Sequence, residues 1–170
     1  MTGSSVLPVA IHHGKLMFLF GLENSLEKSA PGWADFGGSM EKGETPLDAA
    51  IREGHEESSG FFADLPTRLM VDGHLLFGDP EKYNIHVFLH EYDPQMCIHF
   101  NNMHQLMWQK MGPKILGPTC LFEKCQMEWF SVADIKTRIT EFRPFYRKIL
   151  QQFILNDSSL RKIRRFCTKK

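Results

Sequence analysis

The chain has 170 residues, 42% hydrophobic and 24% charged, which suits one globular domain with a core of ordinary size. Lys and Arg total 20 and so do Asp and Glu, so no net charge favours nucleic acid or an anionic membrane as a partner. No apolar run is long enough to span a bilayer, and the first residues lack the features of a secretory signal. We therefore expect a cytoplasmic protein, with the nucleus as an alternative, whose four cysteines are reduced.

Strands are predicted for the first part of the chain. Residues 6–20 alternate imperfectly between apolar and polar side chains around the turn His12-His13-Gly14-Lys15, a pattern typical of a hairpin. Residues 24–32 are then expected to form a polar loop, and residues 33–38 a strand that ends in two glycines. Three strands are thus predicted before the first helix.

The first helix has clear start and stop signals. Thr45 is a suitable N-cap, Pro46 takes the first helical position, and Asp48 stands three residues after the cap. The helix is expected to run to about Ser58, because Gly60 then supplies a stop.

Four carboxylates lie in this helix and in the loop before it. At 3.6 residues per turn Glu53, Glu56 and Glu57 share one face. The opposite, core-facing stripe is Leu47, Ala50, Ile51 and Gly54. Like charges at these spacings repel by roughly a few tenths of a kcal/mol per pair, and Arg52 offsets part of this by reaching Glu56. A divalent cation held by oxygen ligands would offset far more, so the pattern favours a magnesium-phosphate site over a solvated helix face.

These residues closely resemble the signature of the Nudix hydrolases, in which a Gly, a Glu and a final Arg-Glu-x-x-Glu-Glu run have fixed spacing. The matching positions are Gly38, Glu44, Arg52, Glu53, Glu56 and Glu57. Two positions depart from the pattern: Gly54 replaces an apolar residue, and Ser59 stands where Gly is usual. Neither departure removes a metal ligand, so we expect effects only on local stability and on the helix exit. Residues 33–38 and 128–135 also resemble flanking strands of the family, and the likeness extends over roughly residues 6–155.

The resemblance implies an α/β fold, namely an α/β/α sandwich with a mixed β-sheet between the box helix and a C-terminal helix. It also implies hydrolysis of a pyrophosphate bond with Mg²⁺ or Mn²⁺. In this sequence the implied metal ligands are Gly38, through its carbonyl, and Glu44, Glu53, Glu56 and Glu57. Arg52 is expected to orient a glutamate. The general base is left open between a box glutamate and a later one, with Glu91, Glu123 and Glu128 as candidates.

The rest of the chain completes the domain. Strands are predicted over residues 69–77 and 84–92, separated by a turn at residues 78–81, and an amphipathic helix over residues 140–155. We expect a single domain over residues 1–160, with an insertion at about 94–127, and a basic C-terminal tail over residues 161–170.

The insertion over residues 94–127 is expected to select the substrate, because long connections often build pockets. Trp108 and Tyr83 are candidates for stacking on a base, and Trp33 is a weaker one because strand aromatics are mostly core residues. Glu123 and Glu128 are further weak candidates for substrate contacts. The insertion also contains several His and Cys side chains, which we interpret as packing residues, with a zinc site as the alternative. They are Cys97, His99, His104, Cys120 and Cys125.

The substrate is left open between three hypotheses. The first is a small-molecule phosphoanhydride, either a nucleoside diphosphate derivative or a nucleoside triphosphate. The second is the cap of an RNA, for which the cations of residues 161–170 would contact phosphates, or a diphosphoinositol phosphate, which would need cations nearer the pocket. The third is a non-catalytic nucleotide sensor, which the intact glutamates disfavour. The oligomeric state is left open, with a homodimer as one option.

Overall fold

A computed structural model describes residues 2–24, 31–112 and 123–169. Its centre is a seven-stranded sheet in which β3, β2, β1, β6 and β5 follow one another, while β4 pairs with β1 and β7 with β2. The strands are β1 Gly3–His12, β2 Lys15–Glu23, β3 Trp33–Ala34, β4 Phe36–Ser39, β5 His74–Asp79, β6 Tyr83–Leu89 and β7 Lys124–Ser131. β1 is parallel to β6, and the other pairs are antiparallel. The predicted mixed sheet and the hairpin at residues 6–20 are confirmed.

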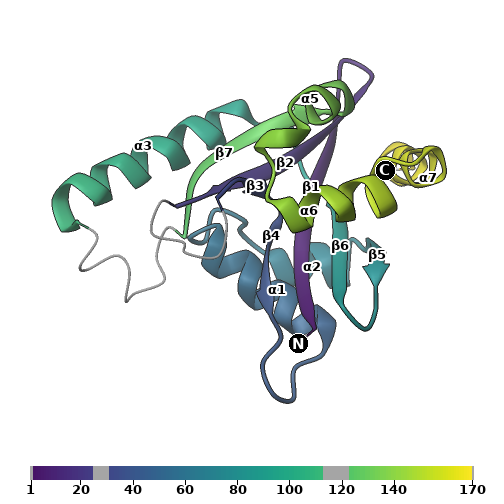
Figure 1. Cartoon of the computed structure of the whole chain (residues 1–170), viewed down its shortest axis with the longest axis horizontal. Helices are drawn as coiled ribbons and strands as arrows, with labels where there is room; N and C mark the ends of the chain where they lie inside the picture. The colour runs from purple at the N-terminus through teal and green to yellow at the C-terminus, as the bar shows by residue number, and fades with distance from the viewer. Residues whose placement is uncertain (1, 25–30, 113–122, 170) are drawn as a thin grey trace.

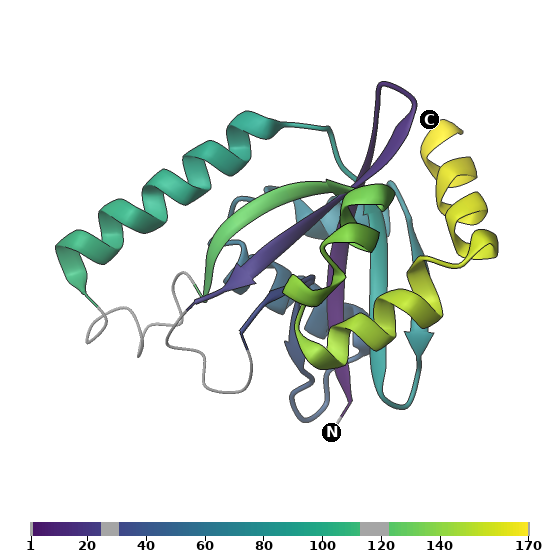
Figure 2. The ribbon, with the colours of Figure 1, turned by 45° about the horizontal axis from the view of Figure 1, so that its top comes forward.

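Helices cover both faces of this sheet (Figures 1 and 2). One face carries α1 (Pro46–Glu57), α2 (Leu65–Met70) and the first half of α3 (Pro94–Met111). The other carries α5 (Val132–Thr137), α6 (Pro144–Ile149), a π-helical segment (Leu150–Ile154) and α7 (Asp157–Thr168), with a short 3-10 helix at Ile139–Glu141. The predicted α/β/α sandwich is therefore confirmed.

The alternation of β1 explains how one strand serves two cores. Val6 packs into the core under α1, whereas the next residue, Leu7, packs into the core under α6 and α7, and both are fully buried. Phe36, Phe62 and Phe100 fill the first core. β1 has few polar residues between Val6 and Ile11 because both of its faces are covered.

Three predicted elements are corrected by the structure. The strand expected over residues 69–77 is wrong in its first half, because α2 occupies Leu65–Met70 and β5 begins only at His74. Gly73, with φ of +87°, separates the two elements. The helix expected over residues 140–155 is divided into the 3-10 turn, α6 and the π-helical segment. The loop predicted at residues 24–32 lies mostly outside the described residues.

Two further segments form helices that the sequence analysis did not predict. The first part of the 94–127 insertion is one helix, α3, which runs alongside β7 (Figure 2) and is joined to it by hydrogen bonds between Asn101 and Met127. The basic segment from residue 161 belongs to α7 up to Thr168, and its Ile163 is fully buried. Across the described residues, no helix is long and apolar enough to cross a membrane.

Replacing Ser59 by Gly should stabilise the protein, because Ser59 has a positive φ of +50° at the exit of α1. A left-handed backbone disfavours any residue with a Cβ, so Ser59→Gly should raise the unfolding free energy by about 0.5–1 kcal/mol, measured by urea denaturation. Gly60→Ala is the matched control: φ is +78° there and a Cβ would touch nothing, so the backbone alone should lower stability. Equal stability of both variants and the parent would contradict this explanation.

Candidate active site

Two glycines at the end of β4 let the box helix approach the sheet. A Cβ on Gly37 would lie 2.2 Å from the Cβ of Ser5 and 2.5 Å from the carbonyl oxygen of Ser4, so no side chain fits there. A Cβ on Gly38 would lie 2.6 Å from both carboxylate oxygens of Glu53. The Glu53 carboxylate therefore lies directly against the Gly38 backbone, and these two implied metal ligands are neighbours.

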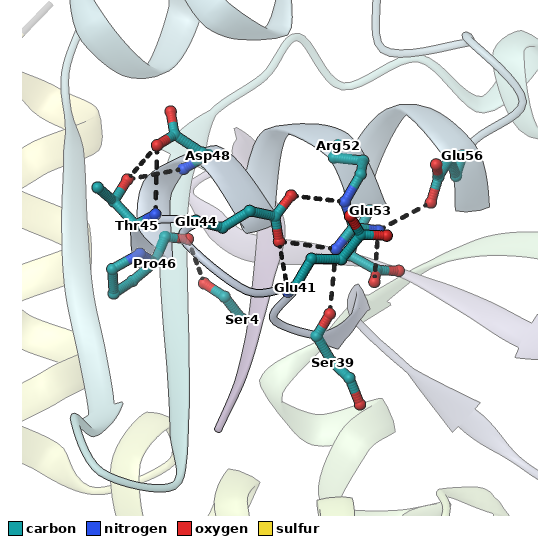
Figure 3. A network of polar contacts seen from close by, with 10 residues as sticks. All are labelled: Ser4, Ser39, Glu41, Glu44, Thr45, Pro46, Asp48, Arg52, Glu53 and Glu56. Atoms are coloured by element: carbon teal, nitrogen blue, oxygen red, sulfur yellow. Dashed lines mark hydrogen bonds and ion pairs between the residues drawn. The ribbon is translucent and has the colours of Figure 1, made fainter. Parts of the chain in front are cut away.

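The start of α1 is fixed as the sequence predicted. The hydroxyl of Thr45 accepts a hydrogen bond from the Asp48 backbone N–H, and the Asp48 carboxylate accepts from the backbone N–H of Thr45. The hydroxyl of Ser4 donates to the Pro46 carbonyl at 2.6 Å and ties this helix end to β1 (Figure 3). The cap and this hydrogen bond hold α1, and with it the glutamates, in one position relative to the sheet.

Arg52 gathers three of the carboxylates (Figure 3). Its guanidinium donates to both oxygens of Glu44, at 2.7 and 3.0 Å, to Glu53 at 2.8 Å and to Glu56 at 3.1 Å. It also donates to the carbonyl of Ser39 at 3.0 Å. The expected contact with Glu56 is confirmed. The hydrogen bonds from Arg52 lower the pKa of the Glu44 carboxyl to about 2, so this carboxylate is charged at any physiological pH.

Glu53 and Glu56 differ in their surroundings. The side chain of Glu56 is 47% exposed, whereas that of Glu53 is 12% exposed. Burial raises the pKa of Glu53, the hydrogen bond from Arg52 opposes the rise, and repulsion by Glu56 and Glu123 adds to it.

Glu57 is not an exposed member of the acidic face. It is 4% exposed, and one of its oxygens accepts a hydrogen bond from the Gly37 backbone N–H at 2.5 Å. The other lies 3.2 Å from Nζ of Lys124, a lysine that is itself fully buried at the start of β7. Burial raises the pKa of Glu57, and the charge of Lys124 opposes this rise. Glu57 therefore differs from the expected glutamate face opposite the core-facing stripe, because its side chain is buried.

Lys124 is the centre of a buried ion-pair chain that sequence reasoning missed. Its ammonium also contacts Glu23 at the end of β2. Glu23 forms a second ion pair with Arg143, whose guanidinium nitrogen lies 2.6 Å from the same carboxylate. Burial disfavours the charge of Lys124, but Glu57 and Glu23 together keep its pKa above the ordinary value. Two carboxylates and two cations thus balance one another inside the protein, which is the condition under which buried charges are tolerated.

A groove opens beside this chain of charges. It has a volume of about 530 Å³ and lies between the end of β2 and the outer half of α3. Glu23 and Asn24 line one side, and Trp108 and His104, whose rings are stacked with centroids 5.6 Å apart, line the other. Glu23 connects the wall of this groove to Glu57 of the box helix through the buried Lys124, although no box residue lines the groove itself.

Other residues predicted for the site lie elsewhere. Trp33 is 4% exposed and packs edge-on against Phe130, so its place as a substrate-stacking candidate is corrected to a core residue. The hydroxyl of Tyr83 donates to the buried Asp35 at 2.8 Å, which turns that side chain into the interior rather than toward a substrate.

Two of the three later glutamates are distant from the box. Glu128 stands four residues beyond Lys124 on β7, about 13 Å of strand, and forms a two-point ion pair with Arg138 at 2.5 and 3.3 Å. Glu91 follows β6 at the end opposite to Gly38, because Leu89 pairs with Val9 whereas Gly38 pairs with Ser4. Glu123, which directly precedes the buried Lys124 at the start of β7, is the remaining later candidate.

The oxygen groups of the box suit a divalent cation. Among the described side chains, no three His, Cys, Asp or Glu residues form a preformed cage, since Arg52 already occupies the carboxylates of Glu44, Glu53 and Glu56. Mg²⁺ does not require such a cage, because it typically keeps several waters and takes one or two carboxylates together with substrate phosphates. Glu53, which lies against Gly38, and Glu56 are held by the same Arg52 guanidinium, so their carboxylates are close enough together to be candidates for such a site.

The alternative zinc site gains no support from the described part of the chain. Cys97 is buried in the core under α3, where burial raises its thiol pKa to about 12. His99 is exposed on the same helix, and His104 contacts Asn24. The thiol of Cys125 donates to the Glu23 carbonyl. No three of these described side chains come together, although His104 and Cys125 line the same groove, and Cys120 lies outside the described residues.

Comparison with known proteins identifies the class. The family model for the NUDIX domain matches residues 12–153, so the chain belongs to the Nudix family. Its class is that of the pyrophosphohydrolases, enzymes that hydrolyse phosphoanhydrides and generally use divalent metal ions. No curated protein matches the sequence significantly.

Solved structures agree with this fold. A Nudix hydrolase from M. smegmatis, RenU, is 13% identical with a TM-score of 0.54, covering 96% of this chain and 86% of its own. An Ap4A hydrolase from C. elegans, in a binary complex, is 17% identical with a TM-score of 0.51, covering 99% of this chain and 100% of its own. The NUDIX domain of Shewanella oneidensis NrtR complexed with ADP ribose is 11% identical with a TM-score of 0.52, covering 96% and 87%.

Proposed function

We propose that this protein hydrolyses the pyrophosphate bond of a nucleoside diphosphate derivative or a nucleoside triphosphate, using Mg²⁺ or Mn²⁺. The observation that carries the proposal is the groove beside Trp108, whose wall includes Glu23, the ion-pair partner of Lys124, which in turn contacts Glu57 of the box. A groove lined by aromatic rings suits the base of a nucleotide, and the carboxylates of the box suit a cation that binds its phosphates.

Each box residue has a distinct role in this proposal. Glu53 and Glu56, with the Gly38 carbonyl, hold the cation, and Glu57 and Glu44 complete the negative site. A bound divalent cation supplies charge neutralisation of the diphosphate and a lowered pKa for its bound water. Arg52 orients Glu53 and Glu56 through the hydrogen bonds at 2.8 and 3.1 Å. Glu123, which affects the pKa of Glu53, is the proposed acceptor of the water proton.

Removing the indole of Trp108 tests the substrate class. Trp108→Ala should weaken the binding of nucleotide substrates by about 1–3 kcal/mol, roughly 5- to 150-fold in KM, because base stacking is lost. The measurement is steady-state hydrolysis of nucleoside triphosphates, nucleotide sugars and dinucleoside polyphosphates. Leu106→Ala is the matched control, since Leu106 is on the same helix, 50% exposed and outside the groove. An unchanged KM for every nucleotide would contradict the proposal that the groove binds the base.

The positions of the exposed cations rank the remaining hypotheses about the substrate. A diphosphoinositol phosphate would need cations beside the box, whereas Arg161, Arg165 and Lys169 are on α7, on the other face of the sheet. A capped RNA stays the second candidate because these cations suit a longer substrate. A purely sensing role is disfavoured by the intact carboxylates at Glu53, Glu56 and Glu57.

A further inference from the structure

The helix α7 displays a row of cations that the protein itself does not neutralise. Arg161, Arg165 and the C-cap residue Lys169 follow at intervals of four residues, so they lie on one side of the helix about 6 Å apart along its axis. All three are exposed, and none forms an ion pair with any residue in the described ranges. By contrast, Arg164 points to another side and donates to the Gly14 carbonyl at 2.9 Å.

These cations line a hollow of their own. It has a volume of about 360 Å³, and Arg161, Lys162, Arg165 and Lys169 all contribute to its wall. The remaining wall includes Ser158 and the half-buried ring of Phe166. The hollow therefore combines four positive charges with one aromatic side chain.

This positive surface is separated from the box. Ile163 of α7 packs into the core on the Leu7 side of β1, whereas Ala50 of α1 packs on the Val6 side. The two helices lie on opposite faces of the sheet (Figures 1 and 2). Although the chain has a formal net charge of zero, its charges are segregated, with unneutralised cations on α7 and clustered carboxylates on α1.

We propose that α7 binds the phosphate backbone of a single-stranded nucleic acid. A row of cations extending over two helical turns fits several phosphates in succession rather than one isolated phosphate. Phe166 offers a face for a base beside the row, as in surfaces that bind single strands by combining charge with stacking. A membrane is a poorer partner, because the apolar face of α7 is already used in the core: Ile163 is fully buried, and Leu160 and Cys167 pack against the same cluster.

Binding of an uncapped, labelled single-stranded oligoribonucleotide tests this inference. Fluorescence anisotropy over a series of salt concentrations compares the full chain with the triple variant Arg161→Gln, Arg165→Gln, Lys169→Gln. Each lost phosphate contact should reduce the log–log salt slope by about 0.7, so three contacts should flatten it by about 2 and weaken binding roughly tenfold or more at low salt. The matched control is Lys82→Gln, Lys110→Gln, Lys136→Gln, which removes three exposed charges outside α7. No turnover is involved, so failure of the proposed hydrolysis would not affect the result.

Three outcomes would overturn the proposal. The first is equal weakening in both triple variants, which would mean a general effect of net charge. The second is competition by inorganic tripolyphosphate as effective as by the unlabelled oligonucleotide, which would mean a site for a small anion. The third is no binding of the oligonucleotide together with α7-dependent binding to anionic lipid vesicles. Both variants should fold, because all six substituted side chains are exposed. Circular dichroism of both variants checks this.

Discussion

Glu53→Gln should lower the Mg²⁺-dependent turnover by roughly two or more orders of magnitude with little change in stability. The substitution keeps the shape of the side chain against Gly38 but removes the negative charge that a divalent cation needs. Because the carboxylate is 12% exposed and its pKa is already raised by burial, a neutral amide is tolerated there. Steady-state hydrolysis of the best substrate, with thermal unfolding of the same sample, measures both effects.

Glu41→Gln is the matched control for this experiment. Glu41 is an exposed carboxylate in the loop before α1, and the contact it makes with Glu44 comes from its backbone N–H, which the substitution retains. Its turnover should equal that of the parent protein. Parent-like rates in Glu53→Gln and Glu56→Gln would exclude the box as the reacting site. Glu57→Gln is a poorer test, because it also removes an ion pair from the buried Lys124.

Lys124→Met should destabilise the fold by about 3–5 kcal/mol. It removes a buried cation from between Glu23 and Glu57 and leaves both carboxylates in the interior without that partner. The free energy of unfolding from urea denaturation is the measurement. Lys136→Met, at an exposed site on α5, is the control and should leave the midpoint almost unchanged.

A second variant separates the charge from the loss of packing. Lys124→Met combined with Glu57→Gln removes the carboxylate that is left without a cation, while Glu23 keeps its ion pair with Arg143, so the double variant should recover part of the lost stability. An unfolding free energy for Lys124→Met equal to that of the parent would mean that the ion-pair chain does not stabilise this protein.

The sequence predicted those contacts of the site that join residues close to one another in the chain. The Thr45 cap, the start of α1 at Pro46 and the contact between Arg52 and Glu56 are all present in the structure. Each depends on residues within one or two helical turns, where spacing decides contact. The departure at Gly54, by contrast, is explained by packing against residues outside the helix, since a Cβ there would lie 2.6 Å from a methyl of Leu65 and 2.8 Å from one of Val6.

Long-range features could not be predicted in the same way. Lys124 was not singled out because its partners are distant in sequence: Glu23 is 101 residues away, and Arg143 contacts Glu23 from 120 residues away. No local pattern distinguishes such a lysine from an exposed one. The strand expected at residues 69–77 failed for a related reason, since the apolar run Leu69-Met70-Val71 suits a helix or a strand and Pro66 at the start of α2 decides for the helix.

The ion pair between Glu57 and Lys124 also constrains the order of folding. The box is continuous in sequence, so α1 with its cap can form early, but Glu57 has no cationic partner until β7 has paired with β2. Closing that long loop is entropically costly and is expected late. On the ribosome, a nascent chain that has emerged only as far as β6 would hold the complete motif without its buried counter-charge. The motif is thus not a self-sufficient module, and its final geometry depends on a strand synthesised long after it.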